Sequence, residues 1–216
     1  MKKMTKFLML LFCGITVFSM TSCLNDSDDD GYVGIDPTTY ANFLASASGN
    51  YNVGTKLYFY NDTITAENNK SMTDSIMGLR AVIAKDSSLV LYDVPGRVLA
   101  KEIKNNEPLK MAIEEAEPVD IVSKILFYNI TQGYGYYYVY SSSVIYNNLE
   151  FNGGKHKVEL QFYIPSGGLY YNKQTTFTSC LSNVKVDDKN AYQIYDGSND
   201  AIAQRRAVLQ FIGSKY

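Results

Sequence analysis

The sequence contains no tryptophan, a single histidine and only three cysteines. One histidine excludes a multi-histidine zinc site, and any Ser-His-Asp or Cys-His catalytic arrangement would have to use His156. Neither Gly133-Tyr134-Gly135 nor Gly153-Gly154 is followed by the helix and lysine of a phosphate-binding loop. The sequence therefore offers no catalytic or metal-binding constellation, and we expect neither an enzyme nor a cofactor.

Concentrated basic charge is also missing. The chain has 20 basic and 22 acidic residues, and its only dense basic cluster is Arg205-Arg206. Proteins that bind nucleic acid carry a basic footprint on one face. Nucleic acid is therefore not an expected partner.

Residues 1–22 predict a lipoprotein signal peptide. Three lysines precede an apolar stretch at residues 7–18, which is shorter than the about 20 residues that span a bilayer. The following Ser-Met-Thr-Ser-Cys resembles a lipobox, with Met20 where leucine is usual. We predict cleavage before Cys23 and attachment of lipid, including palmitate, to Cys23, which anchors the protein to a membrane. An ordinary secretory signal followed by a chance cysteine is the alternative.

Residues 23–35 predict a flexible acidic tether. Four aspartates at positions 26 and 28–30 repel one another and bury nothing. An acidic run after a lipidated cysteine resembles the surface-export signal of Bacteroidota lipoproteins, which implies the outer membrane and the cell surface. The periplasmic face is the alternative. The aspartates also resemble the start of a calcium loop, but Pro37 stands where that loop needs glutamate, so we predict no metal there.

The cysteines give the mature domain no internal disulfide. Cys13 leaves with the signal peptide and Cys23 carries lipid, so only Cys180 remains. Its strand-like surroundings predict a buried structural cysteine.

Residues 36–216 predict one domain with two short helices. Asp36 suits a helix N-cap, Pro37 the first helical position and Gly49 the stop. A second helix fits residues 108–116, with Asn106 as its cap and Pro118 after its end.

Most of the remaining sequence predicts strands. The clearest hairpin turns at Asn152-Gly153, because this pair supplies the positive φ angles of a tight primed turn. Another turns at residues 86–88. We predict a mainly β fold (β-rich α+β), an antiparallel sandwich or curved sheet with one or two short helices. Its further strands are expected at residues 56–60, 76–85, 89–94, 122–130, 136–146, 144–151, 155–164, 177–186, 192–195 and 201–212.

Tyrosine is the most unusual feature of the composition, with 19 residues. In the segment Tyr136-Tyr137-Tyr138-Val139-Tyr140 both faces of a strand carry tyrosine, so one row must face solvent or be covered by another element. Tyrosine also has a high strand propensity, which is a purely structural explanation. The functional hypothesis is a ligand-binding surface for a glycan or an envelope protein. Its candidate residues are Tyr134, Tyr136, Tyr138 and Tyr140.

Three short motifs stand out, namely Gly49-Asn50-Tyr51-Asn52-Val53-Gly54, Lys85-Asp86-Ser87-Ser88-Leu89 before Asp93-Val94-Pro95, and Lys155-His156-Lys157-Val158. Their order resembles a family of Bacteroidota lipoproteins, domain of unknown function 4840. The resemblance implies a lipoprotein and a fold, but no catalytic residues.

Three functional classes follow from the sequence. The leading one is a membrane-anchored, non-catalytic surface binding module. The alternatives are a structural or assembly component of the envelope and, less favoured, a hydrolase. A glycoside hydrolase would need paired carboxylates, for which Glu150 and Glu159 are candidates, but both resemble solvent-facing strand positions. His156, on the apolar face of an alternating strand, predicts a structural role.

Overall fold

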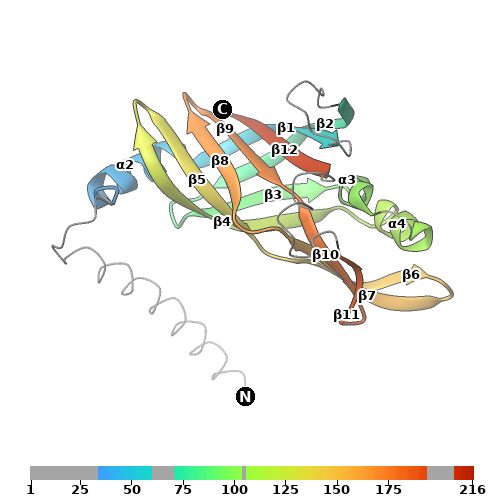
Figure 1. Cartoon of the computed structure of the whole chain (residues 1–216). Helices are drawn as coiled ribbons and strands as arrows, with labels where there is room; N and C mark the ends of the chain where they lie inside the picture. The colour runs from blue at the N-terminus through green and yellow to red at the C-terminus, as the bar shows by residue number, and fades with distance from the viewer. Residues whose placement is uncertain (1–33, 60–70, 104–105, 194–206) are drawn as a thin grey trace, which may run out of the picture. The chain divides into compact units, whose positions relative to one another are not determined.

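The strand-forming sequence closes into a barrel. The computed structural model describes residues 34–59, 71–103, 106–193 and 207–216. Within them, eight antiparallel strands form a closed barrel (Figure 1). Around the barrel the strands are β1 (Gly49–Phe59), β12 (Ala207–Lys215), β9 (Gln174–Ser179), β8 (Ser166–Tyr171), β5 (Tyr134–Ser141), β4 (Val119–Thr131), β3 (Ser88–Val94) and β2 (Ser71–Ile83). The predicted mainly β class is confirmed. The curved sheet closes because β1 pairs with β2 on one side and with β12 on the other.

Side chains fill the barrel. An eight-stranded barrel is just wide enough for inward-facing side chains to occupy its interior. Phe177 and Phe211 stack inside with ring centroids 4.7 Å apart. Alternate residues of the barrel strands supply the other buried side chains, of which the largest are Tyr51, Tyr137, Ile83, Leu89 and Leu91.

A helix covers one end of the barrel. Helix α2 (Pro37–Ala47) begins at Pro37 and ends before Gly49, as the sequence predicts. The Phe43 ring lies edge-on to Phe127 and Tyr170, at 5.3 Å and 5.5 Å between centroids. The Tyr170 hydroxyl donates to the backbone oxygen of Ser46 at 3.0 Å. These contacts fix α2 against β4, β5 and β8.

The long connections that the structure describes leave the barrel at the end opposite α2. Because neighbouring strands run antiparallel, the links from β3 to β4, β5 to β8 and β9 to β12 all emerge there, away from α2 (Figure 1). The first holds α3 (Gly96–Leu99), the 3-10 helix η1 (Ala100–Glu102) and α4 (Glu107–Glu114). The other two contribute β6 (Val144–Phe151), β7 (Gly154–Phe162), β10 (Leu181–Val186) and β11 (Lys189–Gln193).

These insertions pair with one another. They form a second, four-stranded sheet in the order β11-β10-β7-β6. Tyr146, Leu160 and Val184 are buried on it, and α4 packs against β6. The Asn106 side chain accepts from the Leu109 amide at 3.3 Å, which confirms the predicted cap. Within the described residues no helix is long and apolar enough to cross a membrane.

Several strand predictions are confirmed. β2 and β3 pair across residues 84–87. The hairpin predicted at Asn152-Gly153 also forms, and these two residues have φ angles of 50° and 78°. The closing strand expected at residues 201–212 exists from Ala207, and residues 201–206 lie outside the described residues. The predictions for residues 1–33, including the signal peptide, Cys23 and most of the tether, also lie outside them.

Two predicted strands are wrong because each is divided between the two sheets. The strand expected at residues 136–146 ends at Ser141, and β6 begins at Val144 in the second sheet. The strand expected at residues 177–186 ends at Ser179, and β10 begins at Leu181. Both sides of each break are rich in strand-forming residues, so local propensity cannot show where the chain leaves one sheet for the other.

Candidate binding surface on the barrel wall

Strand β5 divides its tyrosines between the inside and the outside of the barrel. Tyr137 is fully buried, and its hydroxyl lies 2.5 Å from the Thr175 hydroxyl. Burial raises the pKa of Tyr137 far above the ordinary tyrosine value. Tyr138 and Tyr140 are 37% and 39% exposed, and Tyr134 and Tyr136 are half-buried on the same outer face. The period of two along a strand therefore separates a structural tyrosine from an outward row.

The outward tyrosines form a continuous aromatic surface. Tyr128 of β4 stacks on Tyr138 with centroids 4.3 Å apart, and its centroid lies 6.4 Å from that of Tyr136. Tyr140 lies edge-on to Tyr138 at 6.5 Å. We call these four residues, together with Tyr134 and Tyr171, the tyrosine wall.

Tyr134 and Tyr171 form the end of the wall nearest the short turns. Their rings are parallel, with 3.9 Å between centroids and 5° between planes. A hydrogen bond with Tyr171 raises the pKa of Tyr134. The pair joins β5 to β8, so the wall spans three strands, β4, β5 and β8.

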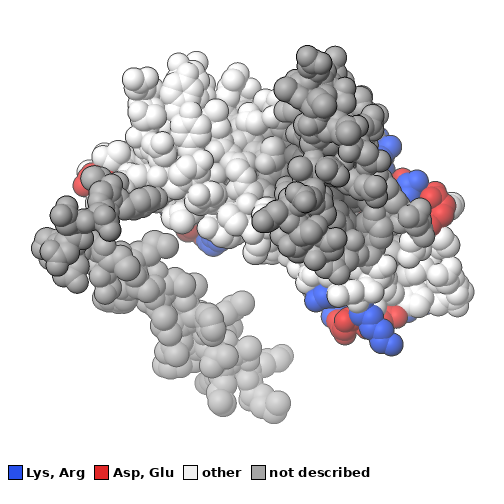
Figure 2. All heavy atoms as spheres, in the orientation of Figure 1, with Lys and Arg blue, Asp and Glu red and all other residues white. Residues whose placement is uncertain are grey.

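Charge is sparse on this part of the barrel, where Lys124 of β4 lies opposite Tyr140. The adjacent strands β5, β8 and β9 read YGYYYVYS, SGGLYY and QTTFTS, with no acidic or basic residue. Figure 2 shows the same contrast, since the barrel end formed by these strands is almost free of charged side chains, which gather near α4 and the second sheet. The wall is therefore aromatic and rich in hydroxyl groups, and it is uncharged on its β8 and β9 side, while Lys124 borders it at Tyr140.

A gap in the side chains adjoins the wall. Gly167 of β8 lies opposite Tyr138, and a Cβ atom placed on Gly167 would have no heavy atom within 4 Å. The Thr178 hydroxyl of β9 donates to the Gly167 oxygen at 3.3 Å. Gly167 thus leaves the space between the Tyr138 and Thr178 side chains without a side chain of its own, and we call this space the notch.

The structure also changes which tyrosines belong to the candidate surface. Tyr146, close to Tyr140 in sequence, is buried in the second sheet, and burial raises its pKa to about 12. Tyr128 and Tyr171 were not among the sequence candidates. Tyr128 could have been found from the hairpin at Gln132-Gly133, which pairs β4 with β5.

His156 lies at the second sheet, away from the tyrosine wall. Its Nδ1 is 2.8 Å from Asp187 Oδ2, and its ring packs on Phe151 at 4.4 Å. The hydrogen bond from His156, together with one from the Lys157 amide, lowers the pKa of Asp187. These contacts join the start of β7 to the turn between β10 and β11, which agrees with the structural role predicted for His156.

The candidate carboxylates of a hydrolase are not brought together. Glu150 on β6 pairs with Lys155 on β7 at 3.1 Å. Glu159 lies on β7 four residues beyond Lys155, opposite Ile145. That spacing is roughly 13 Å along a strand, beyond the about 5–9.5 Å between glycosidase carboxylates. A cavity of about 470 Å³ lies beside the β6–β7 turn, lined by Glu150, Phe151, Gly153, Gly154 and Lys155. It contains one of these carboxylates and no tyrosine of the wall.

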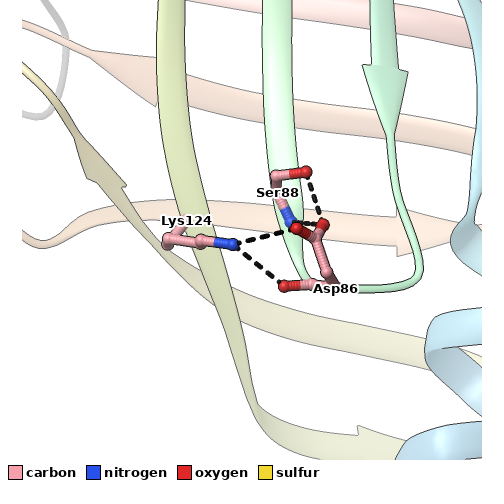
Figure 3. Close-up of polar contacts among 3 residues, drawn as sticks. All are labelled: Asp86, Ser88 and Lys124. Atoms are coloured by element: carbon pink, nitrogen blue, oxygen red, sulfur yellow. Dashed lines mark hydrogen bonds and ion pairs between the residues drawn. The ribbon is translucent and has the colours of Figure 1, made fainter. Parts of the chain in front are cut away.

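A third polar cluster stabilises the β2–β3 turn. The Asp86 carboxylate accepts from the Ser88 amide at 2.9 Å and from its hydroxyl at 2.5 Å. Figure 3 shows Lys124 extending from β4 to the same residue, where it donates to the backbone oxygen at 3.1 Å and the carboxylate at 3.3 Å. The bonds from Ser88, with Lys124, lower the pKa of Asp86 to about 2. These bonds stabilise the β2–β3 turn and connect it to the neighbouring strand β4.

Cys180 is buried, as predicted. Among the described residues, no group of three or more His, Cys, Asp or Glu side chains is arranged to hold a metal ion.

A family comparison covers most of this architecture. The model of the family described as "Domain of unknown function (DUF4840)" matches residues 46–186. The chain belongs to the DUF4840 family. The matched segment runs from the end of α2 to the end of β10 and includes the whole tyrosine wall and the Asp86 turn. No curated protein and no solved structure matches the chain.

Proposed function

We propose that this DUF4840 protein is a membrane-anchored lipoprotein of the bacterial cell envelope and that its barrel is a non-catalytic binding module. The tyrosine wall is the observation that supports binding. Four of its six tyrosines are at least 37% exposed, namely Tyr128, Tyr138, Tyr140 and Tyr171. Contiguous exposed aromatic surface marks interaction sites, and tyrosine is enriched at interfaces.

The lipobox and the acidic tether support the anchor. The acidic tether favours the cell-surface face of the outer membrane in a member of the Bacteroidota. The signal-peptide pattern at residues 1–22 supports export.

The geometry of the polar clusters supports a non-catalytic role. His156 and Asp187 stabilise one turn, and Asp86 stabilises another. The proposed binding surface is instead made of tyrosines, whose chemistry is recognition by ring contact and hydroxyl hydrogen bonds.

The anchor is tested by replacing Cys23 with alanine. We expect the wild type expressed in a Bacteroidota host to incorporate radiolabelled palmitate and to fractionate with the outer membrane. The Cys23→Ala variant should lose both the label and the membrane association. Label retained by the variant would contradict the anchor.

Binding through the wall is tested by replacing Tyr136, Tyr138 and Tyr140 together with alanine. We expect the wild type to retain a ligand from a polysaccharide array or from crosslinked envelope proteins, and the triple variant to lose it. Tyr92→Ala is the matched control, because Tyr92 lies on β3 beneath the Arg80 guanidinium, 4.1 Å from its ring centroid. Equal binding by the wild type and a folded triple variant would refute the role of the wall.

A further inference from the structure

The Tyr138 ring has one covered face and one open side. Tyr128 stacks on it from β4, and β4 and β8 lie on opposite sides of β5. The face turned away from Tyr128 is therefore on the side of β8. Gly167, the residue of β8 opposite Tyr138, places no side chain there. The sequence thus leaves space unoccupied by a side chain on the β8 side of Tyr138.

The rim of this space is polar but uncharged. Thr178 lies across the notch from Tyr138, with its hydroxyl bonded to the backbone of Gly167. Thr176 follows on the same outer face of β9, opposite Leu169. Because β5, β8 and β9 carry no charged residue, the rim can exchange hydrogen bonds with hydroxyl groups but has no charge to pair with an ionic ligand.

A closed barrel also restricts how a partner can bind here. β5, β8 and β9 are each paired on both sides, so this face offers no free strand edge to a peptide. A ligand at the notch must bind through side chains and ring contacts alone.

We propose that the notch between Tyr138 and Thr178 binds a sugar ring of a neutral glycan. The apolar C–H face of the sugar packs on the open face of Tyr138 over Gly167, and its hydroxyls bond to the threonine and tyrosine hydroxyls. An uncharged polyol matches an uncharged, hydroxyl-lined rim. This inference rests on the proposed function and names the ligand class of the same wall.

The test fills the notch without removing a tyrosine. Gly167→Leu places a side chain where the glycine leaves open space, while Tyr138→Ala removes the ring. Both variants and the wild type are titrated with maltohexaose, cellohexaose, laminarihexaose and mannohexaose, and with the anionic polygalacturonate and chondroitin sulfate. Isothermal titration measures affinity, and tyrosine difference absorbance follows the rings, since the chain has no tryptophan. Circular dichroism confirms that each variant is folded.

We expect the wild type to bind at least one neutral hexasaccharide. Gly167→Leu and Tyr138→Ala should each weaken that binding by about tenfold or more, and Tyr92→Ala should leave it within about twofold. The notch is refuted if no neutral hexasaccharide binds, if only the anionic polymers bind, or if Gly167→Leu binds as well as the wild type.

The two proposals fail in different ways. If the triple tyrosine variant loses an envelope protein while no neutral glycan binds the wild type, the proposal of a glycan ligand is refuted and the proposal of a binding module stands. If the triple variant loses nothing that the wild type retains, the binding module itself is overturned.

Discussion

The barrel and the second sheet are stabilised in different ways. Every barrel strand is paired on both sides, and the interior is packed with apolar and aromatic side chains. The second sheet has two edges, at β6 and β11. Polar contacts accompany its turns, with a hydrogen bond between His156 and Asp187 at 2.8 Å and an ion pair between Lys157 and Asp188 at 2.7 Å.

This difference bears on where the protein can afford an exposed functional surface. Closure removes the free edges that make an exposed strand prone to aggregation. The outer wall of the barrel can therefore carry a row of tyrosines without an open edge beside it. The second sheet has edges to protect, and it carries charge near them.

The strongest test of the contrast between the two faces of β5 is a pair of tyrosine substitutions. Tyr137→Ala empties a fully buried site and should lower the free energy of unfolding by about 3–5 kcal/mol, as other large aromatic truncations in cores do. Tyr138→Ala should lower it by no more than about 1.5 kcal/mol, the contribution of an exposed ring contact. Urea denaturation measures both, and equal losses would contradict the assignment of faces.

Two neighbouring glycines test the same contrast at β8. A Cβ atom on Gly168 would lie 2.1 Å from the Tyr137 ring, whereas one on Gly167 meets nothing within 4 Å. Gly168→Ala should therefore cost about 1–3 kcal/mol by overpacking, and Gly167→Ala less than about 0.5 kcal/mol. Thermal unfolding of the two variants separates these outcomes. A larger loss of stability for Gly167→Ala than for Gly168→Ala would contradict the assignment of the inner and outer faces of β8.

The smallest expected effect concerns the charged turn of the second sheet. Asp187→Asn removes the carboxylate bonded to His156 and keeps a residue that tolerates the positive φ of 50° at this position. Amide exchange should speed up at Lys157 and along β10 and β11, with no change in the barrel. The matched control is Asp188→Asn, which loses only the exposed contact with Lys157.

The pH dependence of that turn has a defined sign. Because the folded pKa of Asp187 is lowered from 3.8, its carboxylate stabilises the turn above that value, and the effect is lost as the pH falls through the folded pKa. Wild type and Asp187→Asn should therefore converge in exchange rate in acid. A difference that persists after the Asp187 carboxylate has been protonated would show that the charge is not responsible.

The sequence predicts the elements better than their assembly. Helix caps and turns are local, so Pro37, Asn106 and the Asn152-Gly153 turn are readable from residue chemistry alone. The alternation around Tyr137 also predicts that one tyrosine row faces outward. Barrel closure depends on β1 pairing with both β2 and β12, and such distant pairing leaves no local signal.

The candidate site shows the same limit. Tyr136, Tyr138 and Tyr140 are recognisable as one face of a strand because they share its period of two. Tyr128 and Tyr171 join them only through neighbouring strands, and the bulge between Phe127 and Asn129 shifts the register that sets which β4 side chains meet β5. The notch at Gly167 likewise exists only once β8 lies beside β5, although 24 residues lie between Ser141 and Ser166 in the chain.

The position of β12 has a consequence for folding. The family match ends at residue 186, but β1 and β9 are both completed by a strand that begins at Ala207. Until that strand is in place, one edge of β1 and one edge of β9 stay unpaired, and the sheet remains open. Folding of this barrel therefore needs residues beyond the family match, and a chain truncated at residue 186 should aggregate rather than fold.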